Sequence, residues 1–340
     1  MRGALRAIVV ATAAACTVAA CSSHPDRTSQ HGSADAPRPT TSTGATSGSR
    51  IANPPHRGRA VTTRVLHWRL PHPVSRAVAM RYAAGRALLA GGLGPGDVST
   101  PRVLLVDLTS GSVHQTSDLA KPVHDSAGAV LAGRPTVFGG GGLTELDDVQ
   151  QMDRHGRWRV VGHLPQARSD LSVTTPTPRR AVVIGGYDGR RTPTSVLLTE
   201  DGSHFSTDAR LPAGVRYAGV AYSHGQLWVF GGEDNGHELS EVLRVDVSTG
   251  RVRRVGRLPR PLGHEAVVPL GDRLLVLGGR TSPATVTSRM WCYEPARGTW
   301  TRAGRLPYPV ADAASVSMGG SVYLLGGETP GFTADVIRVQ

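Results

Sequence analysis

The chain has 340 residues, of which 39% are hydrophobic and 19% are charged, and its formal net charge is +12 at pH 7. Seven arginines and two aspartates in the first 60 residues leave 31 basic and 24 acidic residues for the rest, and all but one of those basic residues are arginine. Because no basic stripe with interleaved aromatic residues is present, the composition argues against a nucleic-acid-binding protein.

The first 20 residues have the features of an export signal. Arg2 and Arg6 precede an apolar stretch over residues 7–20 that is too short to span a bilayer. This stretch ends in Val-Ala-Ala, and Cys21 follows directly, which resembles a bacterial lipoprotein lipobox whose cysteine takes the lipid. Residues 1–20 are therefore predicted to be a lipoprotein signal peptide. The alternative is an ordinary signal peptide with a chance cysteine, which would give a secreted protein.

Residues 21–60 are rich in Ser, Thr, Pro and Gly and contain almost no large apolar side chains. Such a segment cannot bury enough surface to offset its chain entropy, so we expect a flexible linker, anchored by lipid at Cys21 to the outer side of the cytoplasmic membrane. The lipid is the only membrane contact expected. Loss of the signal and acylation of Cys21 would leave Cys292 as the one free thiol, which we expect to be a small core residue.

A short apolar run ending in two glycines recurs six times after residue 60. The first glycines of the pairs are 48, 46, 46, 47 and 48 residues apart, a regularity that indicates a repeat architecture. We expect the pairs to allow bulges and close backbone approach at strand ends, because no phosphate-loop motif accompanies them. The pairs are Gly91-Gly92, Gly139-Gly140, Gly185-Gly186, Gly231-Gly232, Gly278-Gly279 and Gly326-Gly327.

Each unit contains the signals of four short strands. A strand of small and apolar residues comes first, and the strand ending in the glycine pair comes second. The third strand ends in an acidic residue followed by a turn glycine, in which the carboxylate can accept hydrogen bonds from the backbone of its own turn. The fourth strand often holds an aromatic residue and runs into Leu-Pro. The acidic turns are at Asp107, Asp153, Glu200, Asp246 and Glu294, and the aromatic residues are Trp158, Phe205 and Trp300.

Four antiparallel strands in each unit of about 45 to 50 residues indicate an all-β propeller. The glycine doublet, the acidic turn and the tryptophan near the fourth strand resemble the kelch-repeat family. The resemblance covers residues 62–340 and implies a six-bladed kelch-type β-propeller over residues 61–340. The tyrosine usual in that family a few residues after the doublet is missing from most units, and the first two units are degenerate.

The two ends of the repeat region complement each other. The sixth unit stops at Gln340 after its third strand, whereas residues 62–70, TTRVLHWRL, form a fourth strand without a blade of their own. Pairing the two would remove both exposed sheet edges. We therefore predict that residues 62–70 close the sixth blade.

One polar position recurs at the start of the first strands. The fifth residue after each Leu-Pro proline is polar or ionisable although the strand that follows is apolar, and the second unit offers His124 and Asp125 nearby. In a propeller this position and the loops after the glycine pairs lie at one mouth of the central channel. The recurring residues are Arg76, Asp170, Tyr217, His264 and Asp312, and the loops add Glu145, Asp147, Asp188, Arg190, Arg191, Glu233, Asp234, His237, Arg280 and Glu328.

The recurring residues, together with Arg280 and Glu233, are the candidate ligand-binding residues at the channel mouth. The first hypothesis is a binding or interaction module, monomeric, for a small polar ligand or for a protein or peptide. The second is a sugar epimerase or mutarotase that resembles the exported six-bladed kelch epimerases acting on sialic acid; the resemblance implies that Arg76, Tyr217, His264, Arg280 and Glu233 would act on the sugar. The third is a non-catalytic structural envelope protein.

No self-sufficient catalytic set supports an enzyme, and we expect no cofactor. No metal site is expected either, because the metal-binding spacings H-x-H, H-E-x-x-H and C-x-x-C do not occur. The resemblance in fold does not decide among the three hypotheses of binding module, epimerase and structural protein, since propellers host many functions.

Overall fold

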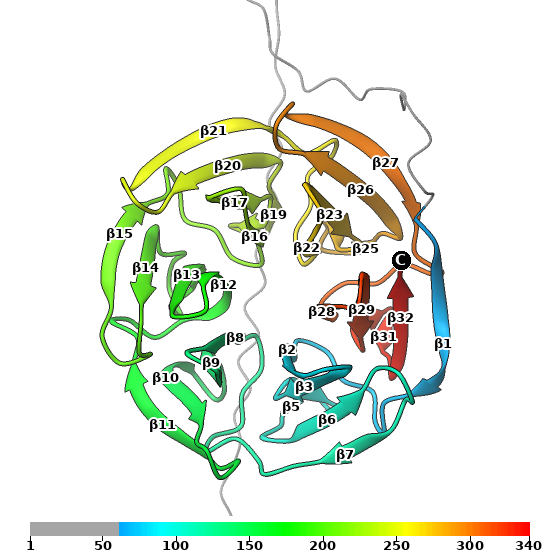
Figure 1. The fold of residues 1–340 in the computed structure, drawn as a ribbon. Coiled ribbons are helices and arrows are strands. Elements are labelled where there is room, and N and C mark those ends of the chain that lie inside the picture. Colours follow the sequence, from blue (N-terminus) through cyan, green and yellow to red (C-terminus); the bar gives the residue numbers. More distant parts are fainter. Residues whose placement is uncertain (1–60) are drawn as a thin grey trace, which may run out of the picture. The chain divides into compact units, whose positions relative to one another are not determined.

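The computed structural model describes residues 61–340, so the predicted signal peptide, the linker and Cys21 lie outside the described residues. Residues 61–340 form six four-stranded antiparallel sheets around a central axis (Figure 1). The predicted six-bladed β-propeller is therefore confirmed. Within the described residues no helix is long and apolar enough to cross a membrane.

Blades I to V take their strands in sequence from the axis outward. Blade I consists of β2 (Val78–Ala83), β3 (Arg86–Ala90), β6 (Val103–Asp107) and β7 (Val113–Gln115), and blade II of β8 (Ala127–Leu131), β9 (Arg134–Gly141), β10 (Glu145–Met152) and β11 (Trp158–His163). Blade III consists of β12 (Ser169–Thr177), β13 (Arg180–Tyr187), β14 (Ser195–Thr199) and β15 (Ser206–Arg210), and blade IV of β16 (Gly219–Ser223), β17 (Gln226–Phe230), β20 (Glu241–Asp246) and β21 (Arg251–Arg257).

Blade V consists of β22 (Ala266–Leu270), β23 (Arg273–Leu277), β26 (Arg289–Glu294) and β27 (Thr299–Arg305). Blade VI joins the two ends of the described chain and consists of β28 (Ala314–Met318), β29 (Ser321–Leu325), β32 (Asp335–Val339) and β1 (Thr63–Arg69). Thr63 lies opposite Val339, and Arg69 lies opposite Asp335. The prediction that the N-terminal strand closes the sixth blade is confirmed.

Apolar side chains fill the spaces between neighbouring blades. Between blades IV and V the ring of Phe230 meets Tyr293 and Trp300 edge-on, with centroids 5.5 and 5.8 Å apart. Trp300, the aromatic residue predicted in a fourth strand, is 1% exposed. Burying an aromatic side chain of this size contributes roughly 1.5–3 kcal/mol. Cys292, on β26, is buried in the next core, between blades V and VI, as expected for a small core residue.

The glycine pairs allow neighbouring blades to approach each other. Both glycines of each pair have positive φ, for example 63° at Gly185 and 105° at Gly186. A Cβ on Gly185 would lie 2.2 Å from the carbonyl oxygen of Val215 in the next blade, and the Gly186 N–H donates to that same oxygen at 2.9 Å. Any side chain here would collide with this backbone, so the structural interpretation of the pairs is confirmed.

The predicted acidic turns form as expected where the residue is aspartate. Asp107 Oδ1 accepts hydrogen bonds from the N–H groups of Thr109 and Ser110, and Asp153 and Asp246 act in the same way. The prediction is wrong at Glu200, which pairs with Arg180 while Asp201 caps the turn. Glu294 likewise pairs with a side chain, that of Arg297. The shorter aspartate is the residue that reaches back to its own turn.

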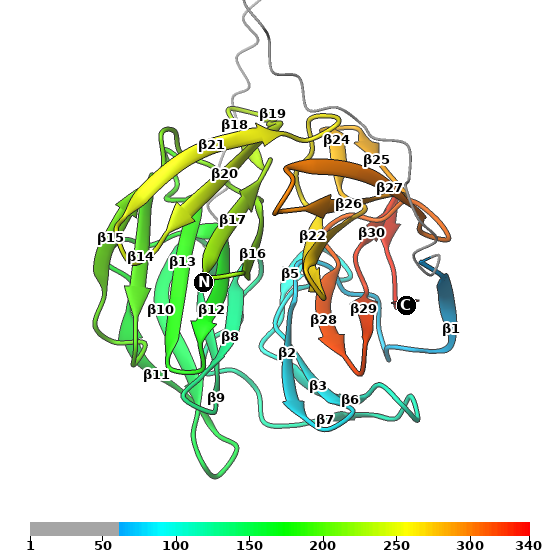
Figure 2. The same cartoon turned by 45° about the horizontal axis from the view of Figure 1, so that its top comes forward.

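Four two-stranded ribbons follow glycine pairs and belong to the face that holds the candidate site. Two of them, β18–β19 and β24–β25, stand side by side at that face (Figure 2). The ribbons are β4 (Leu93–Gly94) with β5 (Val98–Ser99), β18 (Glu233–Asp234) with β19 (His237–Glu238), β24 (Arg280–Ser282) with β25 (Thr285–Val286), and β30 (Glu328–Thr329) with β31 (Gly331–Phe332).

Candidate functional site at the channel mouth

One residue from each blade forms a closed ring of backbone hydrogen bonds around the axis. In each case the N–H donates to the carbonyl oxygen of the corresponding residue in the preceding blade, over 2.8–3.2 Å. The ring closes because Arg76 of blade I donates to Asp312 of blade VI. We call these six residues the axial ring: Arg76, Asp125, Asp170, Tyr217, His264 and Asp312.

All six residues of the axial ring have positive φ, between 48° and 61°. Glycine adopts this conformation without strain, and aspartate and histidine tolerate it better than most residues, but for bulky residues such as Arg76 and Tyr217 it is uncommon. Each such residue costs roughly 1–2 kcal/mol in backbone energy. Glycine at all six positions would form the same backbone ring without this strain. The side chains of the axial ring are therefore present in spite of a cost in backbone energy.

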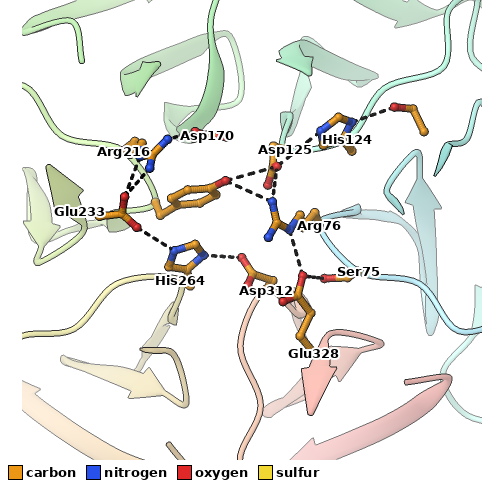
Figure 3. Close-up of polar contacts among 12 residues, drawn as sticks. Ser75, Arg76, His124, Asp125, Asp170, Arg216, Glu233, His264, Asp312 and Glu328 are labelled. Atoms are coloured by element: carbon orange, nitrogen blue, oxygen red, sulfur yellow. Dashed lines mark hydrogen bonds and ion pairs between the residues drawn. The ribbon is translucent and has the colours of Figure 1, made fainter. Parts of the chain in front are cut away.

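Nine ionisable side chains, acidic and basic in strict alternation, run through all six blades, and Figure 3 shows all of them except Arg280. We call them the mouth network. Its contacts are Asp170–Arg216 (3.4 Å), Arg216–Glu233 (3.0 Å), Glu233–His264 (3.4 Å), His264–Asp312 (2.7 Å), Asp312–Arg280 (3.5 Å), Arg280–Glu328, Glu328–Arg76 (2.9 Å) and Arg76–Asp125 (2.9 Å).

The mouth network is open at one point only. Its two ends, Asp125 of blade II and Asp170 of blade III, belong to neighbouring blades, and in the described part of the chain no hydrogen bond or ion pair joins their side chains. Burial raises the pKa of both carboxyl groups, against the opposing effects of Arg76 on Asp125 and of Tyr217 and Arg216 on Asp170. Repulsion between the two carboxylates raises the pKa of Asp125 further. The open point therefore favours holding a proton.

Tyr217 spans the channel. Its hydroxyl lies 3.3 Å from Arg76 Nη1 of the opposite blade and 3.4 Å from Asp125 Oδ2, to which it donates. Its ring stacks on His264 with centroids 3.7 Å apart. The guanidinium of Arg216 lies 5.4 Å from the centroid of the same ring, at cation–π distance. An aromatic side chain held from three sides thus crosses the channel at the level of the axial ring.

The carboxylates of the mouth network lie beneath its arginines. The side chains of its five acidic residues are 4–9% exposed, whereas those of Arg76, Arg216 and Arg280 are 24, 27 and 17% exposed. A molecule approaching from solvent therefore meets guanidinium groups first. Buried carboxylates fix the orientation of these groups by charge-assisted hydrogen bonds.

His264 is held in its charged form. Burial lowers its pKa, but the hydrogen bond and the charge of Asp312, together with Glu233, outweigh burial and raise the pKa to about 9. In return, the hydrogen bond with His264 lowers the pKa of Glu233 to about 2. At neutral pH the site thus holds a protonated imidazole between two ionised carboxylates.

Three hollows adjoin the axial ring. A cavity of about 140 Å³ is lined by the ring residues themselves. It continues along the first strands into a channel of about 480 Å³, lined by small residues such as Ala79, Gly128 and Ser172. A third hollow of about 450 Å³ opens beside Arg216, and the other residues that line it are Tyr187, Arg190, Arg191, Thr192, Asp234 and Asn235.

All seven candidate ligand-binding residues from the sequence meet here. Six of them, Arg76, Asp170, Glu233, His264, Arg280 and Asp312, belong to the mouth network, and Tyr217 lies within it. Asp125 is the sixth member of the axial ring, and Glu328 joins from the loops named above.

Arg216 was missed by the sequence reasoning. The residue before each ring position pairs with the residue directly after a glycine pair, as Arg216 does with Glu233. A comparison of these two positions along the sequence could have found it.

Several other predicted mouth residues take no part in the mouth network. Asp147 contacts His163 of the outer strand β11 at 3.0 Å, and with Asp148 these two form a group that could hold a metal ion, although Lys121 Nζ already lies 2.7 Å from Asp148. Asp188 accepts hydrogen bonds from its own loop, and His237 is exposed in a ribbon.

Comparisons with known proteins agree on the family. The KLHDC2/KLHL20/DRC7 Kelch-repeats domain matches residues 153–327, more than half of the chain. Beta-scruin from Limulus polyphemus is 24% identical over 173 residues, which are 47% of this chain and 19% of that protein. Kelch-like protein 35 from Mus musculus is 30% identical over 77 residues, 23% of this chain and 13% of that protein. This chain therefore matches less than a fifth of either relative.

The same fold occurs in a solved structure. The structure of YjhT superposes with a TM-score of 0.69 at 16% sequence identity, covering 80% of this chain and 99% of that one. An identity this low shows the fold alone. Together with the domain match and the six blades with their glycine pairs, it leads to one conclusion: the chain belongs to the kelch-repeat family.

Proposed function

We propose that the channel mouth binds a small polar ligand, and that the propeller is carried as a lipoprotein on the outer side of the cytoplasmic membrane. A kelch propeller is in general a binding or interaction module. The observation that carries the proposal is the axial ring, where six non-glycine residues hold strained positive φ angles and direct linked ionisable side chains to one point. Backbone strain of this kind clusters at ligand sites, because the function of the side chain there compensates for the backbone energy.

The charges of the mouth favour a ligand with an anionic group. The partly exposed guanidinium groups of Arg76, Arg216 and Arg280 face solvent over buried carboxylates. The hollow beside Arg216 adds Arg190 and Arg191, and Tyr187 provides a flat apolar surface there. A carboxylate or phosphate group would be held by arginine, and hydroxyl groups would bond to the carboxylates below. An extended acidic peptide would satisfy the same groups.

Binding can be tested with a panel of sugar acids, neutral sugars and small phosphates. A ligand present at about 100 times its Kd should raise the melting temperature by roughly 5–10 °C. We expect this shift to vanish in Tyr217→Phe and Arg216→Gln, which alter the mouth, and to persist in Arg86→Gln, whose arginine is exposed beside Asp107.

Two outcomes would contradict binding at the mouth. One is a ligand shift that is equal in all three variants. The other is the absence of any shift across the panel, together with a large loss of stability in the mouth variants, which would favour a structural envelope protein.

The location is tested separately at Cys21. We expect the protein made in a bacterial host with labelled palmitate to carry the label and to sediment with membranes. Cys21→Ser should lose the label. Unlabelled, soluble wild-type protein would indicate secretion instead.

A sugar epimerase or mutarotase is the second candidate, favoured by the opposed pKa shifts of His264 and Glu233. Opening a sugar ring requires a proton delivered to the ring oxygen and another removed from the anomeric hydroxyl. At neutral pH His264 carries a proton that it could deliver to the ring oxygen, and the neighbouring Glu233 is an ionised acceptor for the other proton. NMR exchange between sugar anomers, with the protein and with His264→Gln, tests this function: acceleration by the wild type alone supports it, and equal rates refute it.

A further inference from the structure

Four arginines form a cluster of a single charge sign at the junction of blades IV and V. Arg289 on β26 lies directly opposite Arg305 on β27, and Arg302 lies opposite Trp291, with its guanidinium 5.9 Å from the indole centroid. Arg260 follows β21 in the loop between the two blades, and its charge, with those of Arg302 and Arg305, lowers the pKa of Arg289. We call these four residues the arginine cluster.

No acidic side chain among residues 61–340 pairs with the arginine cluster. Nearby arginines are paired, as Arg254 is with Glu241 at 2.6 Å and Arg297 with Glu294 at 3.0 Å. Within the cluster, the hydrogen bond of Arg305 goes to the hydroxyl of Ser288. Like charges directly opposite each other in a sheet destabilise it. The cluster therefore does not serve the stability of the blades.

The described chain enters the propeller beside this cluster. Thr63 Oγ1 donates to the carbonyl oxygen of Arg305 at 3.0 Å, and Val61 and Ala303 both pack against the core between blades V and VI. Cys21 stands 40 residues before Val61 in the sequence. If residues 21–60 are the flexible linker that their composition predicts, their root-mean-square reach is about 35 Å. An anchor at Cys21 would thus hold the arginine cluster within reach of the membrane.

We propose that the arginine cluster docks on anionic phospholipid headgroups of the membrane that carries the lipid anchor. The inference rests on the proposed lipoprotein location and is independent of the ligand at the channel mouth. Three of the four arginines are exposed and Arg289 is half-buried. Basic residues beside a membrane are attracted to its negative surface, and their contributions fall off within a Debye length.

The test measures binding of the full chain carrying Cys21→Ser to vesicles. The vesicles contain phosphatidylcholine alone or with roughly 30% phosphatidylglycerol, enough to give a negative surface potential. The apolar stretch over residues 7–20 is present in every variant, so the part of binding that depends on phosphatidylglycerol is compared. One variant replaces the whole cluster: Arg260→Gln, Arg289→Gln, Arg302→Gln and Arg305→Gln.

A matched control changes the net charge equally at four exposed arginines of blades I–III: Arg81→Gln, Arg134→Gln, Arg179→Gln and Arg210→Gln. We expect the cluster variant to lose phosphatidylglycerol-dependent binding by about 10- to 100-fold, and the control by about 2-fold. The melting temperature of the cluster variant should be unchanged or higher, because like-charge repulsion is relieved.

Three results would overturn the proposal: equal losses in the two variants, wild-type binding indifferent to phosphatidylglycerol, or equally tight binding to soluble polyphosphate, which would indicate a general polyanion surface. Because the protein tested lacks Cys21, each result is independent of acylation. The labelling experiment at Cys21 reports separately on the location.

Discussion

Glu265 is a carboxyl group buried next to the axial ring without a charged partner. It follows His264, yet Oε1 accepts a hydrogen bond from the Gly219 N–H of the neighbouring blade at 3.2 Å, and Oε2 has no partner in the described part of the chain. Burial raises its pKa to about 8. At neutral pH the group is therefore mainly protonated.

The variant Glu265→Gln should remove a pH dependence of stability. The folded protein holds this proton up to about pH 8, whereas an unfolded glutamate releases it near 4.5. Between these values the folded state binds more protons, so the free energy of unfolding falls as the pH rises, by about 1.4 kcal/mol per unit for one group. The free energy of unfolding of the variant lacks this decrease. The difference between variant and wild type should therefore increase from pH 4.5 to about pH 8 and stay constant at higher pH.

Urea unfolding of both proteins across that pH window gives the measurement. Glu200→Gln, at an exposed glutamate paired with Arg180, is the control. A difference between wild type and Glu265→Gln that stays constant across the window would show that Glu265 is ionised throughout.

Five of the six axial ring residues could be predicted from the sequence, because Leu-Pro fixes where each first strand begins. For the second unit, the sequence indicated only that His124 and Asp125 lie near the ring position. In the second unit the sequence between Leu119 and Pro122 is longer, so the ring position follows the proline by three residues instead of five. The ion pairs could not be predicted, since they depend on which side chains of different blades meet at the axis.

At the scale of the elements, β1 contributes more than hydrogen bonds to blade VI. Leu66 and Leu70 are buried in the core between blades VI and I. Trp68 covers Gly111 of blade I so closely that a Cβ there would lie 2.3 Å from the indole. The closing strand therefore joins the last blade to the first through side chains as well as through backbone pairing.

Removal of β1 should destabilise the propeller and open an edge. A chain beginning at Ser75 leaves the outer edge of β32 unpaired, so we expect a lower melting temperature and self-association through the exposed edge. A chain beginning at Ala60 is the control. If the shorter chain does not fold, Leu66→Ala should still reduce the free energy of unfolding by roughly 2–4 kcal/mol. A monomeric shorter chain with an unchanged melting temperature would contradict this role.

The strand order and the closing strand were predictable because residues 62–70 and the short sixth unit complement each other in the sequence. The turn at Glu200 was not, because glutamate and aspartate look equivalent in a pattern of charges. Glutamate and aspartate differ here only in the length of the side chain. Asp201, one position later, has the shorter side chain that a turn of this size requires.

At the scale of the whole molecule, the axial ring makes the blades depend on one another. Each of its six N–H groups is bonded to the preceding blade, so no blade can move outward without breaking two hydrogen bonds at the axis. The repeat pattern in the sequence determines which blades are neighbours, which is why equivalent positions around the axis could be anticipated. It does not specify contacts across the axis, and the approach of Tyr217 to Arg76 could not be predicted.

Hydrogen exchange should report this dependence. We expect the amides of the axial ring in all six blades to exchange with one common free energy, that of global unfolding. In Leu66→Ala this free energy should fall equally at all six positions. Measurement by NMR or mass spectrometry distinguishes this from local opening, in which only the amides of blades VI and I would exchange faster.

The span of Tyr217 also limits how this protein could change in evolution. Repeat proteins gain or lose whole units readily, and an added blade would leave every glycine pair and every core between blades intact. It would, however, widen the circle, and a single phenol ring could no longer reach Arg76 on the far side. Duplication of a unit would therefore preserve the fold but remove the contact between Tyr217 and Arg76.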